Sequence, residues 1–597
     1  MPNKFSSLFS IKIGGSNVPE EFYDSIEEAI VDTQLNMPGM FSIRLHDPDL
    51  KWVDDEMLDI GRELSISATL NEQDASEMGA AGNNSLIEGE ITAIEPDFGE
   101  KGKTSLVIRG YDKMHRLMRG SKTRTFLNLT DTELIEKLAH ESRLMIGKVE
   151  GPGVKQEYII QYNQTNMELI AARAERTGYN FFMSGSKFYY LPGKSSTPGT
   201  PVQLVYLETL IKFKPRWTAN GQADHIVVKG WDALGKEAVI GEYTPSSGLN
   251  QGGMDKPGGE VSKSAFGAAD EVVTERIVSN PSDAKSVAAG VSWQIDRSFV
   301  QADGVCFGHP KVLAGCQVDI KRIGKRFSGK YFVTAAKHVY SPKGYRTHFR
   351  ISGRRVDTLS AILSNESRTG QEQGLVTGII TAIVSNLKDP EKIGRVKVQY
   401  AWLGNIESNW ARLATPMAGN QRGFMFLPEV NDEVVIAFEQ GDIHRPYIIG
   451  TVWNTKDAPP ESSDSVVKNG KVSKRIIKSR SGHLIVLDDS EGAEQIIIRD
   501  KTGANEIVID STEKSIRIKM DNDLITKANG VTTIESMGKL TLKSSNDVAI
   551  ECVNFSVKAK ASAEINAQAS VNVKNAAASI ALSGPSVNIN NGALEVI

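Results

Sequence analysis

Short apolar pairs, each interrupted by one other residue, recur along the C-terminal part of the chain. They follow one another at steps of about eight residues, and mostly Ser, Asn, Asp, Lys, Gly and Ala lie between them. Alternation inside a pair is typical of a β-strand, and self-similarity at a short fixed step is typical of a β-solenoid. Each repeat supplies too few apolar side chains to form a core within one chain. We therefore expect residues 505–597 to form a fibrous, intertwined homotrimer.

The core of this predicted trimer consists of the members of those pairs. They are Ile516, Ile518, Leu540, Leu542, Val548, Ile550, Val571, Val573, Ile580 and Leu582. At about 25 cal/mol per Å2, burying each set against two partner chains contributes a few kcal/mol per repeat. Pairing of strand edges between chains also removes the exposed edges that favour aggregation.

The N-terminal stretch, residues 1–353, alternates short strand-like runs with Gly and Pro turn signals. This pattern is typical of small β-barrels or sandwiches. Helices interrupt it: Thr130 predicts the start of one, and Gly178 predicts the end of another over 166–177. Residues 243–266, which mix Pro, Ser, Gly and Lys, predict a linker or surface loop. Residues 354–373 predict the hinge to the next domain.

Residues 374–454 form a compact pattern of five short strands, one of them over Phe424–Phe426, with Gly, Asp and Pro at the corners, which fits an OB-like barrel. Some OB barrels bind oligonucleotides through aromatic and basic side chains. The aromatic residues here, Trp402, Trp410, Phe424 and Phe426, are not interleaved with a basic stripe, so we expect no nucleic-acid partner. Residues 455–470 predict a second linker, and residues 471–597 the trimeric repeat.

Composition excludes several classes of partner and site but does not indicate an activity. The net charge of -4 over 597 residues gives no electrostatic case for nucleic acid or a membrane surface. No signal peptide and no apolar run of about 20 residues is present, so we expect synthesis in the cytoplasm. Cys306, Cys316 and Cys552 match no zinc spacing, and we expect Cys306 and Cys316 to be buried free thiols.

Two groups of residues carry candidate chemistry. Asp112 and His115 could form an acid–base pair, but no second carboxylate or nucleophile accompanies them, so we expect a hydrogen-bonded corner at a strand end. His309, His338 and His348 suggest a metal site, yet their spacing is not that of a ligand set. We expect no enzyme activity, no metal and no cofactor.

The domain order and several motifs resemble the VgrG family, the spike proteins of contractile injection systems of phage-tail descent. The OB-like stretch carries the family's phrases in order: Asp389-Pro390, Gly394-Arg395-Val396-Lys397-Val398, Trp410-Ala411-Arg412, Pro428-Glu429-Val430, Asp432-Glu433-Val434, Phe438-Glu439 and Gly441-Asp442. Residues 1–353 resemble the phage hub module through Gly110-Tyr111-Asp112, His115-Arg116-Leu117 and the stretch from Phe327 to His338. The terminal residues 592–597 resemble a family needle end.

This resemblance implies a mainly β fold: a hub-like double barrel with helical insertions, an OB barrel and a trimeric triple-stranded β-helix. The chain departs from some relatives: the short 455–470 linker leaves no room for a lysozyme domain, and we expect no toxin after the needle. The opening from Leu35 to Pro48 is closer to spikes of extracellular or membrane-anchored phage-tail-like particles than to those of type VI secretion.

The function that the resemblance implies is mechanical. A homotrimer would adapt a hexameric tube to a threefold needle and be driven through a target envelope, with the membrane met only by puncture. Expected partners are the inner tube protein, baseplate proteins, a cargo effector and a PAAR-type (proline-alanine-alanine-arginine) tip protein. The tip protein would dock on four C-terminal residues: Val587, Ile589, Leu594 and Val596. The alternatives are a trimeric receptor-binding fibre or adhesin and a cell-wall hydrolase.

Overall fold

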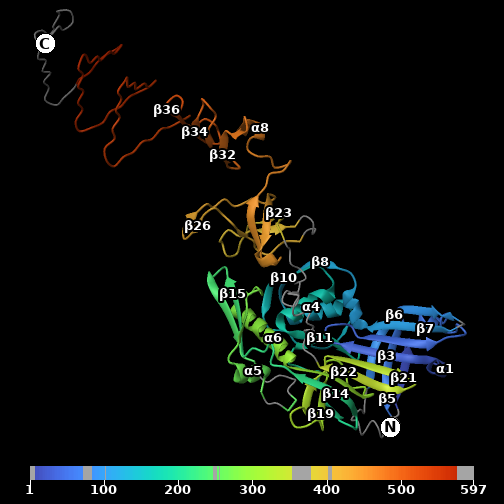
Figure 1. Cartoon of the computed structure of the whole chain (residues 1–597). Helices are drawn as coiled ribbons and strands as arrows, with labels where there is room; N and C mark the ends of the chain where they lie inside the picture. The colour runs from blue at the N-terminus through green and yellow to red at the C-terminus, as the bar shows by residue number, and fades with distance from the viewer. Residues whose placement is uncertain are drawn as a thin grey trace, which may run out of the picture. The chain divides into compact units, whose positions relative to one another are not determined.

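The computed structural model describes most of the chain. The described residues are 7–70, 84–100, 103–245, 252–253, 256–351, 378–400 and 406–573. They form two compact units, residues 1–463 and 464–597 (Figure 1). Strands hold 42% of the residues and helices 14%, which confirms the predicted mainly β fold class. No helix within the described ranges is long and apolar enough to cross a membrane.

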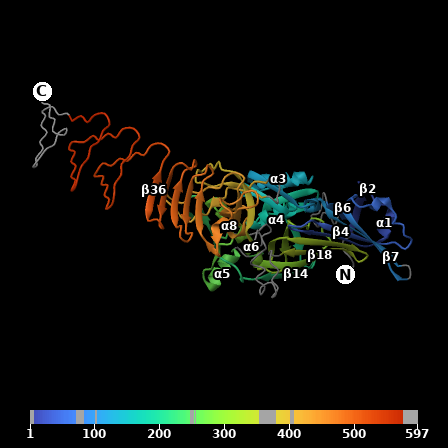
Figure 2. The ribbon, with the colours of Figure 1, turned by 90° about the horizontal axis from the view of Figure 1, so that it is seen from above.

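One eleven-stranded sheet organises the N-terminal part of the first unit (Figure 2). Its strands, in hydrogen-bonded order, are β14 (Leu210–Trp217), β18 (Val300–Phe307), β22 (Gly344–Ile351), β21 (Ala335–Ser341), β3 (Ile26–Gln34), β4 (Met40–His46), β7 (Thr104–Asp112), β6 (Ser85–Phe98), β5 (Glu63–Leu70), β1 (Ser7–Ile13) and β2 (Ser16–Asn17). Pairing of β3 with β21 joins strands more than three hundred residues apart in the chain, so the two ends of the hub share a sheet.

Two separate apolar cores lie against this sheet. The first contains Phe41 and Leu45 and is closed by α1 (Glu20–Asp24), with η1 (Glu56–Leu58) nearby. The second contains Val300 and Tyr331 and is closed by the small sheet of β13 (Val202–Val205), β19 (Gln317–Lys321) and β20 (Gly329–Phe332). Alternating burial, as along β22, gives each strand one core-facing side. The hub therefore contains two barrel-like halves, as predicted.

An insertion of helices and short sheets lies between these halves in sequence. It contains β8 (Lys122–Thr130), α3 (Asp131–Glu141), β9 (Met145–Val149), β10 (Lys155–Gln164), α4 (Asn166–Thr177), β11 (Tyr179–Ser184) and β12 (Lys187–Pro192), after η3 (Lys113–Met118). Thr130 and Thr165 each close a capping box at the start of their helix, and Gly178 ends α4 with φ of 73°. The predicted helix boundaries are confirmed.

A second insertion packs a sheet on a long helix. Its elements are β15 (His225–Asp232), β16 (Glu237–Tyr243), α5 (Gly258–Phe266), β17 (Asp270–Val273) and α6 (Pro281–Phe299). Val228 and Val239 of the sheet bury against Ala284 and Val287 of α6. The prediction of a linker over 243–266 was wrong for its last third, because Val261 packs against the second barrel core and fixes α5 there.

The OB domain is a five-stranded barrel, as predicted. Its sheet runs β24 (Lys397–Gln399), β23 (Ile380–Asn386), β28 (Glu433–Phe438), β29 (Pro446–Thr451) and β25 (Arg412–Leu413), with the hairpin of β26 (Ala418–Gly419) and β27 (Arg422–Gly423) and the short helix η6 (Glu439–Gly441). The first insertion contacts it: the Tyr158 hydroxyl donates to the Glu407 carbonyl at 2.9 Å, and the Ile160 N–H donates to His444 Nε2 at 3.0 Å.

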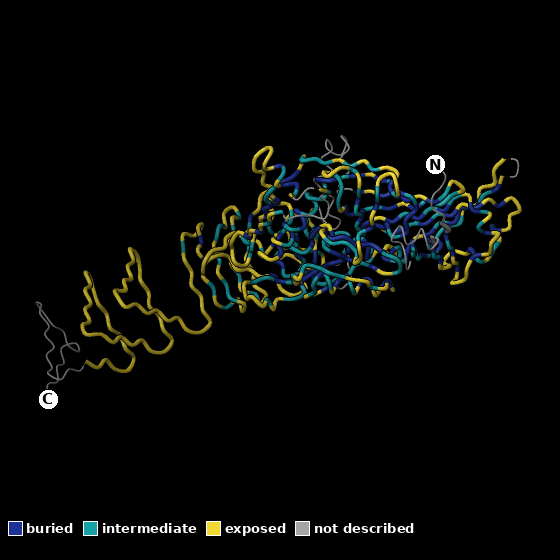
Figure 3. Tube along the Cα trace, turned by 90° about the horizontal axis from the view of Figure 1, so that it is seen from below, coloured by how far each residue is buried: buried dark blue, intermediate teal, exposed yellow. Residues whose placement is uncertain are grey.

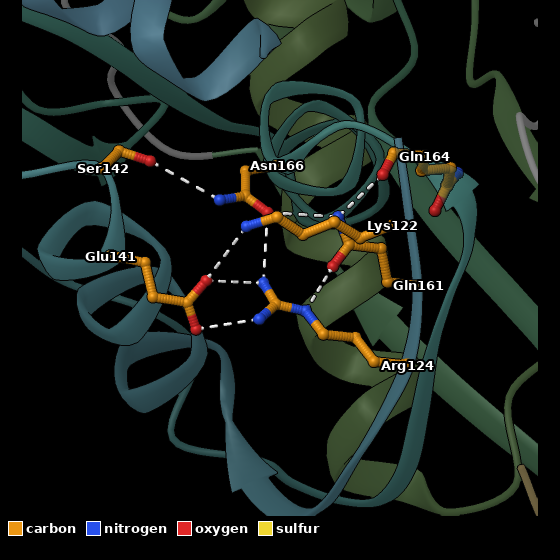
Figure 4. A network of polar contacts seen from close by, with 7 residues as sticks. All are labelled: Lys122, Arg124, Glu141, Ser142, Gln161, Gln164 and Asn166. Carbon is orange, nitrogen blue, oxygen red and sulfur yellow. Dashed lines mark hydrogen bonds and ion pairs between the residues drawn. The ribbon is translucent and has the colours of Figure 1, made fainter. Parts of the chain in front are cut away.

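A polar network fixes the β8–β10 ribbon that makes these contacts (Figure 4). Arg124 donates to both Glu141 oxygens at 2.9 and 2.7 Å, to Gln161 Oε1 at 2.8 Å and to Asn166 Oδ1 at 3.1 Å. Gln161 and Asn166 are buried. Burial alone would raise the pKa of Glu141, but Arg124 and Lys122 hold that pKa below its ordinary value. One guanidinium thus satisfies acceptors from three different elements.

The second unit is a five-stranded antiparallel meander followed by irregular chain. After the short elements α8 (Ser463–Val466), β30 (Val467–Lys468) and β31 (Lys471–Val472), the strands are β32 (Lys474–Lys478), β33 (Leu484–Asp488), β34 (Gln495–Arg499), β35 (Glu506–Asp510) and β36 (Ser515–Lys519). Regular strands therefore begin inside the predicted repeat of 471–597 and before its first predicted apolar pair at Ile516. Residues 520–573 form no strand in the single chain.

Candidate functional site

The structure separates the candidate acid–base pair. Asp112 is buried, caps η3 by accepting from the Met114 N–H at 2.9 Å, and accepts from the Gly39 N–H at 2.6 Å. Desolvation raises the pKa of Asp112 to about 7. His115 instead lies 2.7 Å from Glu90, which also pairs with Arg116. The predicted hydrogen-bonded corner at a strand end is confirmed.

Packing also explains the glycine of this motif. A Cβ on Gly110 would lie 2.1 Å from the Glu90 carbonyl oxygen and 2.2 Å from Phe41 Cζ. Both neighbours belong to a closed sheet and its core, so no side chain fits at this position. The motif Gly110-Tyr111-Asp112 is therefore a folding determinant of the first barrel.

The three histidines lie in different environments of the second half of the hub. His338 is buried, with Nε2 at 3.0 Å from the Val312 carbonyl and Nδ1 at 2.7 Å from the Tyr345 hydroxyl, and burial lowers its pKa to about 3. His309 accepts from the Lys311 N–H, and His348 lies on the outer face of β22. Within the described ranges no group of His, Cys, Asp or Glu is arranged to hold a metal ion.

The cysteines are free thiols. Cys306 is buried, as predicted, Cys316 is only half-buried, and Cys552 is exposed. Burial raises the pKa of the Cys306 and Cys316 thiols, so neither is a reactive thiolate at neutral pH.

The Asp389-to-Arg395 motif organises one corner of the OB barrel. The Asp389 carboxylate accepts from the N–H groups of Glu391, Ile393 and Arg395 at 3.0–3.1 Å and from the Arg395 guanidinium at 2.7 and 3.0 Å. Burial alone would raise the pKa of this carboxyl, but Arg395 and the backbone donors lower it to about 2. The motif holds the loop between β23 and β24.

We expect Asp389→Ala to lower the free energy of unfolding of the OB domain by about 2 kcal/mol at pH 7. The folded pKa, about 2, lies below the ordinary 3.8, so the carboxylate stabilises the domain fully above pH 3.8 and stops doing so as the pH falls through 2. Urea unfolding at pH 7 and at decreasing pH measures the difference between variant and wild type. Glu391→Ala, an exposed carboxylate in the same loop, is the matched control; an equal loss in both variants would contradict the assignment.

The most unusual surface of the described chain is one face of the β32–β36 sheet. Two cross-strand rows of aliphatic side chains occupy it. The first row is Ile477, Ile485, Ile498, Ile507 and Ile518, and the second is Leu487, Ile496, Ile509 and Ile516. These nine side chains are 39–67% exposed. We call this surface the apolar face; Figure 3 shows these strands among the exposed and half-buried parts of the tube.

The apolar face contains two of the predicted core residues, Ile516 and Ile518. The remaining described members of the predicted core, Leu540, Leu542, Val548, Ile550, Val571 and Val573, are 55–76% exposed in the single chain. Ile580, Leu582 and the tip residues Val587, Ile589, Leu594 and Val596 lie outside the described residues. Exposed apolar side chains in a long continuous series mark a surface that another chain covers.

The sequence placed residues 471–597 in the predicted trimeric repeat, but its apolar pairs did not include the seven residues of the apolar face before Ile516. The signal was present, because Leu484–Leu487, Gln495–Ile498 and Glu506–Ile509 show the same strand-like apolar runs. Only the register shows that alternate residues of these runs share one uncovered face.

The OB domain carries a second uncovered apolar surface beside the β26–β27 hairpin. Its large side chains, 40–79% exposed, are Met417, Phe424, Met425, Phe426, Leu427 and Val430. The prediction of a strand over Phe424–Phe426 was wrong, because this segment leaves the sheet after Gly423. Trp410 stays on the barrel with Lys397 5.4 Å and Arg395 5.9 Å from its ring centre. Trp402 lies outside the described residues.

Two family profiles match the chain. The profile of the type VI secretion system/phage-baseplate injector OB domain matches residues 380–453, and that of the Alg8 N-terminal domain matches residues 7–341. The second match covers more than half of the chain. Together the two profiles account for the hub and the OB barrel described above.

Curated relatives are spike proteins of type VI secretion. VgrG1a of Pseudomonas aeruginosa is 24% identical over 420 residues, which are 64% of this chain and 62% of the relative. VgrG1c of the same organism is 23% identical over 57% of this chain and 49% of the relative. The chain thus spans less than two thirds of the length of these relatives. Among solved structures, the VgrG of a Francisella PdpA–VgrG complex matches 87% of this chain and 80% of its own with a TM-score of 0.50 at 9% identity, a likeness of fold alone.

Proposed function

Since the chain belongs to the family of the Alg8 N-terminal domain and carries an injector OB domain, we propose that it is the spike of a contractile, phage-tail-like injection particle. The observation that carries this proposal is the apolar face. Nine aliphatic side chains on one side of a five-stranded sheet need a cover, and the single chain provides none within its described residues. Three copies packed around an axis would cover one another.

The hub supports the change of symmetry that such a spike requires. Each chain contains two barrel-like halves that share one sheet, so three chains present six related positions. Such a ring matches a hexameric inner tube on one side and a threefold needle on the other. The contacts of Tyr158 and Ile160 with the OB domain connect the hub to the neck.

The function we propose is force transmission. Contraction of a sheath drives the tube and spike through a target envelope. The spike therefore contacts the target membrane only when it punctures it. The partners are the inner tube protein, baseplate proteins, a PAAR-type tip protein on Val587, Ile589, Leu594 and Val596, and a cargo effector. The solved structure of similar fold is a complex of PdpA with VgrG, so this fold occurs in a complex with a second protein. Assembly in the bacterial cytoplasm precedes release or anchoring of the particle.

The test is the native mass of the full-length chain by light scattering, beside a form ending at Ser463. We expect a trimer of three times 65.1 kDa for the full chain and a loss of that trimer, or aggregation, for the shorter form. A stable full-length monomer at micromolar concentration would overturn the proposed spike, because neither the threefold needle nor the six-position ring could then form.

A further inference from the structure

Charge is unevenly distributed over the hub, although the whole chain carries a net charge of only -4. A trimeric ring is closed by a head-to-tail interface, in which two different surfaces of each chain meet. The chain therefore needs a pair of complementary surfaces if it forms the proposed trimer. Two exposed surfaces of the hub carry opposite charge.

The first surface is the solvent-facing side of β14, β18, β22 and β21, which we call the basic face. Its exposed cations are Lys212, Lys214, Arg216, Lys337, Arg346 and Arg350. The register places them in neighbouring rows: Lys212 opposes Val305, Val305 opposes His348, and His348 opposes Lys337. The one exposed carboxylate on these strands, Asp303, lies 3.5 Å from Arg350.

The pKa shifts of His348 and Asp32 agree with this placement of the cations. Desolvation lowers the pKa of His348, and Lys337 and Arg346 lower it further. Desolvation raises the pKa of Asp32 on the adjacent strand β3, while Lys337 and Arg350 oppose that rise. Cations from β21 and β22 therefore act on the same groups, and the basic face has an excess of positive charge.

The second surface lies at the α1 end of the first barrel, and we call it the acidic end. Its exposed carboxylates are Glu20, Glu21, Asp24, Glu27, Asp49 and Asp54. Exposed carboxylates in residues 20–63 number nine, against three exposed lysines and arginines. Negative charge therefore predominates over this whole stretch.

Packing holds these carboxylates on one structure. Phe22 of α1 lies edge-on to Trp52, with ring centres 5.2 Å apart, and the Trp52 indole N–H donates to Ser25 Oγ at 3.0 Å. Lys51 forms an ion pair with Glu21. The Asp47 carboxylate accepts from the backbone N–H groups of Trp52 and Val53 at 3.0–3.2 Å. The helix α1 and the loop over 47–58 therefore present their charges as one rigid surface.

Within one chain the basic face and the acidic end lie in different parts of the hub. No ion pair among the residues that the structure describes joins a member of the basic face to a member of the acidic end. Figures 1 and 2 both show α1 away from β14, and in Figure 1 β3 and β21 lie between them. Each surface therefore lacks an oppositely charged partner of its own size in the same chain.

We infer that the basic face of one copy docks on the acidic end of the neighbouring copy in the hub ring. This inference rests on the proposed trimer and specifies which surfaces close it. Charge complementarity of this kind directs association and fixes the register of the partners. It is also screened by salt over about 10 Å at 0.1 M, so the contact weakens as ionic strength rises.

Carbodiimide cross-linking of the assembled full-length protein tests this directly, because the reagent joins an amine to a carboxylate only when the two are in contact. The products are separated on a denaturing gel, and the monomer, dimer and trimer bands are mapped by peptide mass spectrometry. We expect links from Lys212, Lys214 or Lys337 to the acidic end in the dimer and trimer bands and not in the monomer band.

Substitutions that reverse the charge of either surface test the same contact in a second way. Lys212→Glu, Lys214→Glu and Arg216→Glu together should lower the yield of links from the unchanged Lys337 about tenfold, and Glu20→Lys, Glu21→Lys and Asp24→Lys together should do the same for links to the unchanged Glu27, Asp49 and Asp54. Combining both triples in one chain should restore the links with the roles of the two surfaces exchanged. Reversal of three exposed lysines elsewhere in the hub, Lys187, Lys229 and Lys285, is the matched control and should leave the yield unchanged.

The outcomes separate this inference from the proposed function. A monomer by light scattering before cross-linking would overturn the spike proposal and the inference with it. A trimer without links between the two surfaces would overturn the inference alone. So would a trimer whose links survive either reversal, or one in which the combined variant is not restored.

Discussion

Replacing Ile496 and Ile509 together by Asp is expected to convert the assembled trimer into monomers. The two residues oppose each other on β34 and β35 and are 42% and 41% exposed in the single chain. Covering the exposed half of an aliphatic side chain contributes about 1 kcal/mol, so the nine side chains of the apolar face contribute on the order of 10 kcal/mol per chain.

The substitution opposes this stabilisation in two ways. It removes two of the nine side chains, and it places two carboxylates per chain in an apolar contact, at a cost of several kcal/mol per buried charge. Six carboxylates near one axis also repel one another. The native mass by light scattering should fall from three times 65.1 kDa to 65.1 kDa at micromolar concentration.

The matched control is Lys478→Asp with Lys519→Asp, on the other face of the outer strands of the same sheet. Both lysines are exposed. This control adds two carboxylates to the same sheet, and the trimer should persist. A trimer that survived the isoleucine substitutions would show that the apolar face is covered by something other than a second and third copy.

Arg124→Met is expected to lower the free energy of unfolding of the first insertion by about 3 kcal/mol. The substitution leaves Gln161 Oε1 and Asn166 Oδ1 without their charged donor and removes both bonds to Glu141 (Figure 4). Tyr158 and Ile160 of the β8–β10 ribbon donate hydrogen bonds to the OB domain. The contact between the hub and the OB domain should therefore weaken as well.

Hydrogen exchange followed by mass spectrometry measures both effects, as faster exchange in β8, β10 and the segment around His444. Arg109→Met is the matched control, because Arg109 pairs with Glu95 at 3.1 Å on an exposed surface, where such a pair contributes up to about 1 kcal/mol. Equal effects of the two substitutions would contradict a special role for the Arg124 network.

Local motifs predicted much of the fold because each is a short-range physical rule. Thr130 and Gly178 mark helix ends through capping and a left-handed φ, and both were located from sequence. The resemblance to VgrG spike proteins is likewise confirmed by relatives of that name. The failures at α5 and at Phe424–Phe426 share a cause: composition indicates neither what a segment packs against nor where it leaves a sheet.

The apolar face, too, was only partly predictable from the sequence. Sequence periodicity predicted Ile516 and Ile518 to be core residues of a trimer, and in the single chain they are 67% and 56% exposed. It did not identify Ile477 or Ile496, because a strand-like run has the same pattern whether its partner is in the same chain or in another. Register decides that question, since it brings alternate residues of five strands onto one face.

The sequence by itself determined the mainly β class and the helix ends at Thr130 and Gly178. These depend on neighbours a few residues apart. Only the tertiary structure decided that Asp112 and His115 have separate partners, that His338 is a hydrogen-bonded core residue, and that charge divides into a basic face and an acidic end. Those features join strands as distant as β3 and β21, and pairing at such separation depends on the packing of the whole hub.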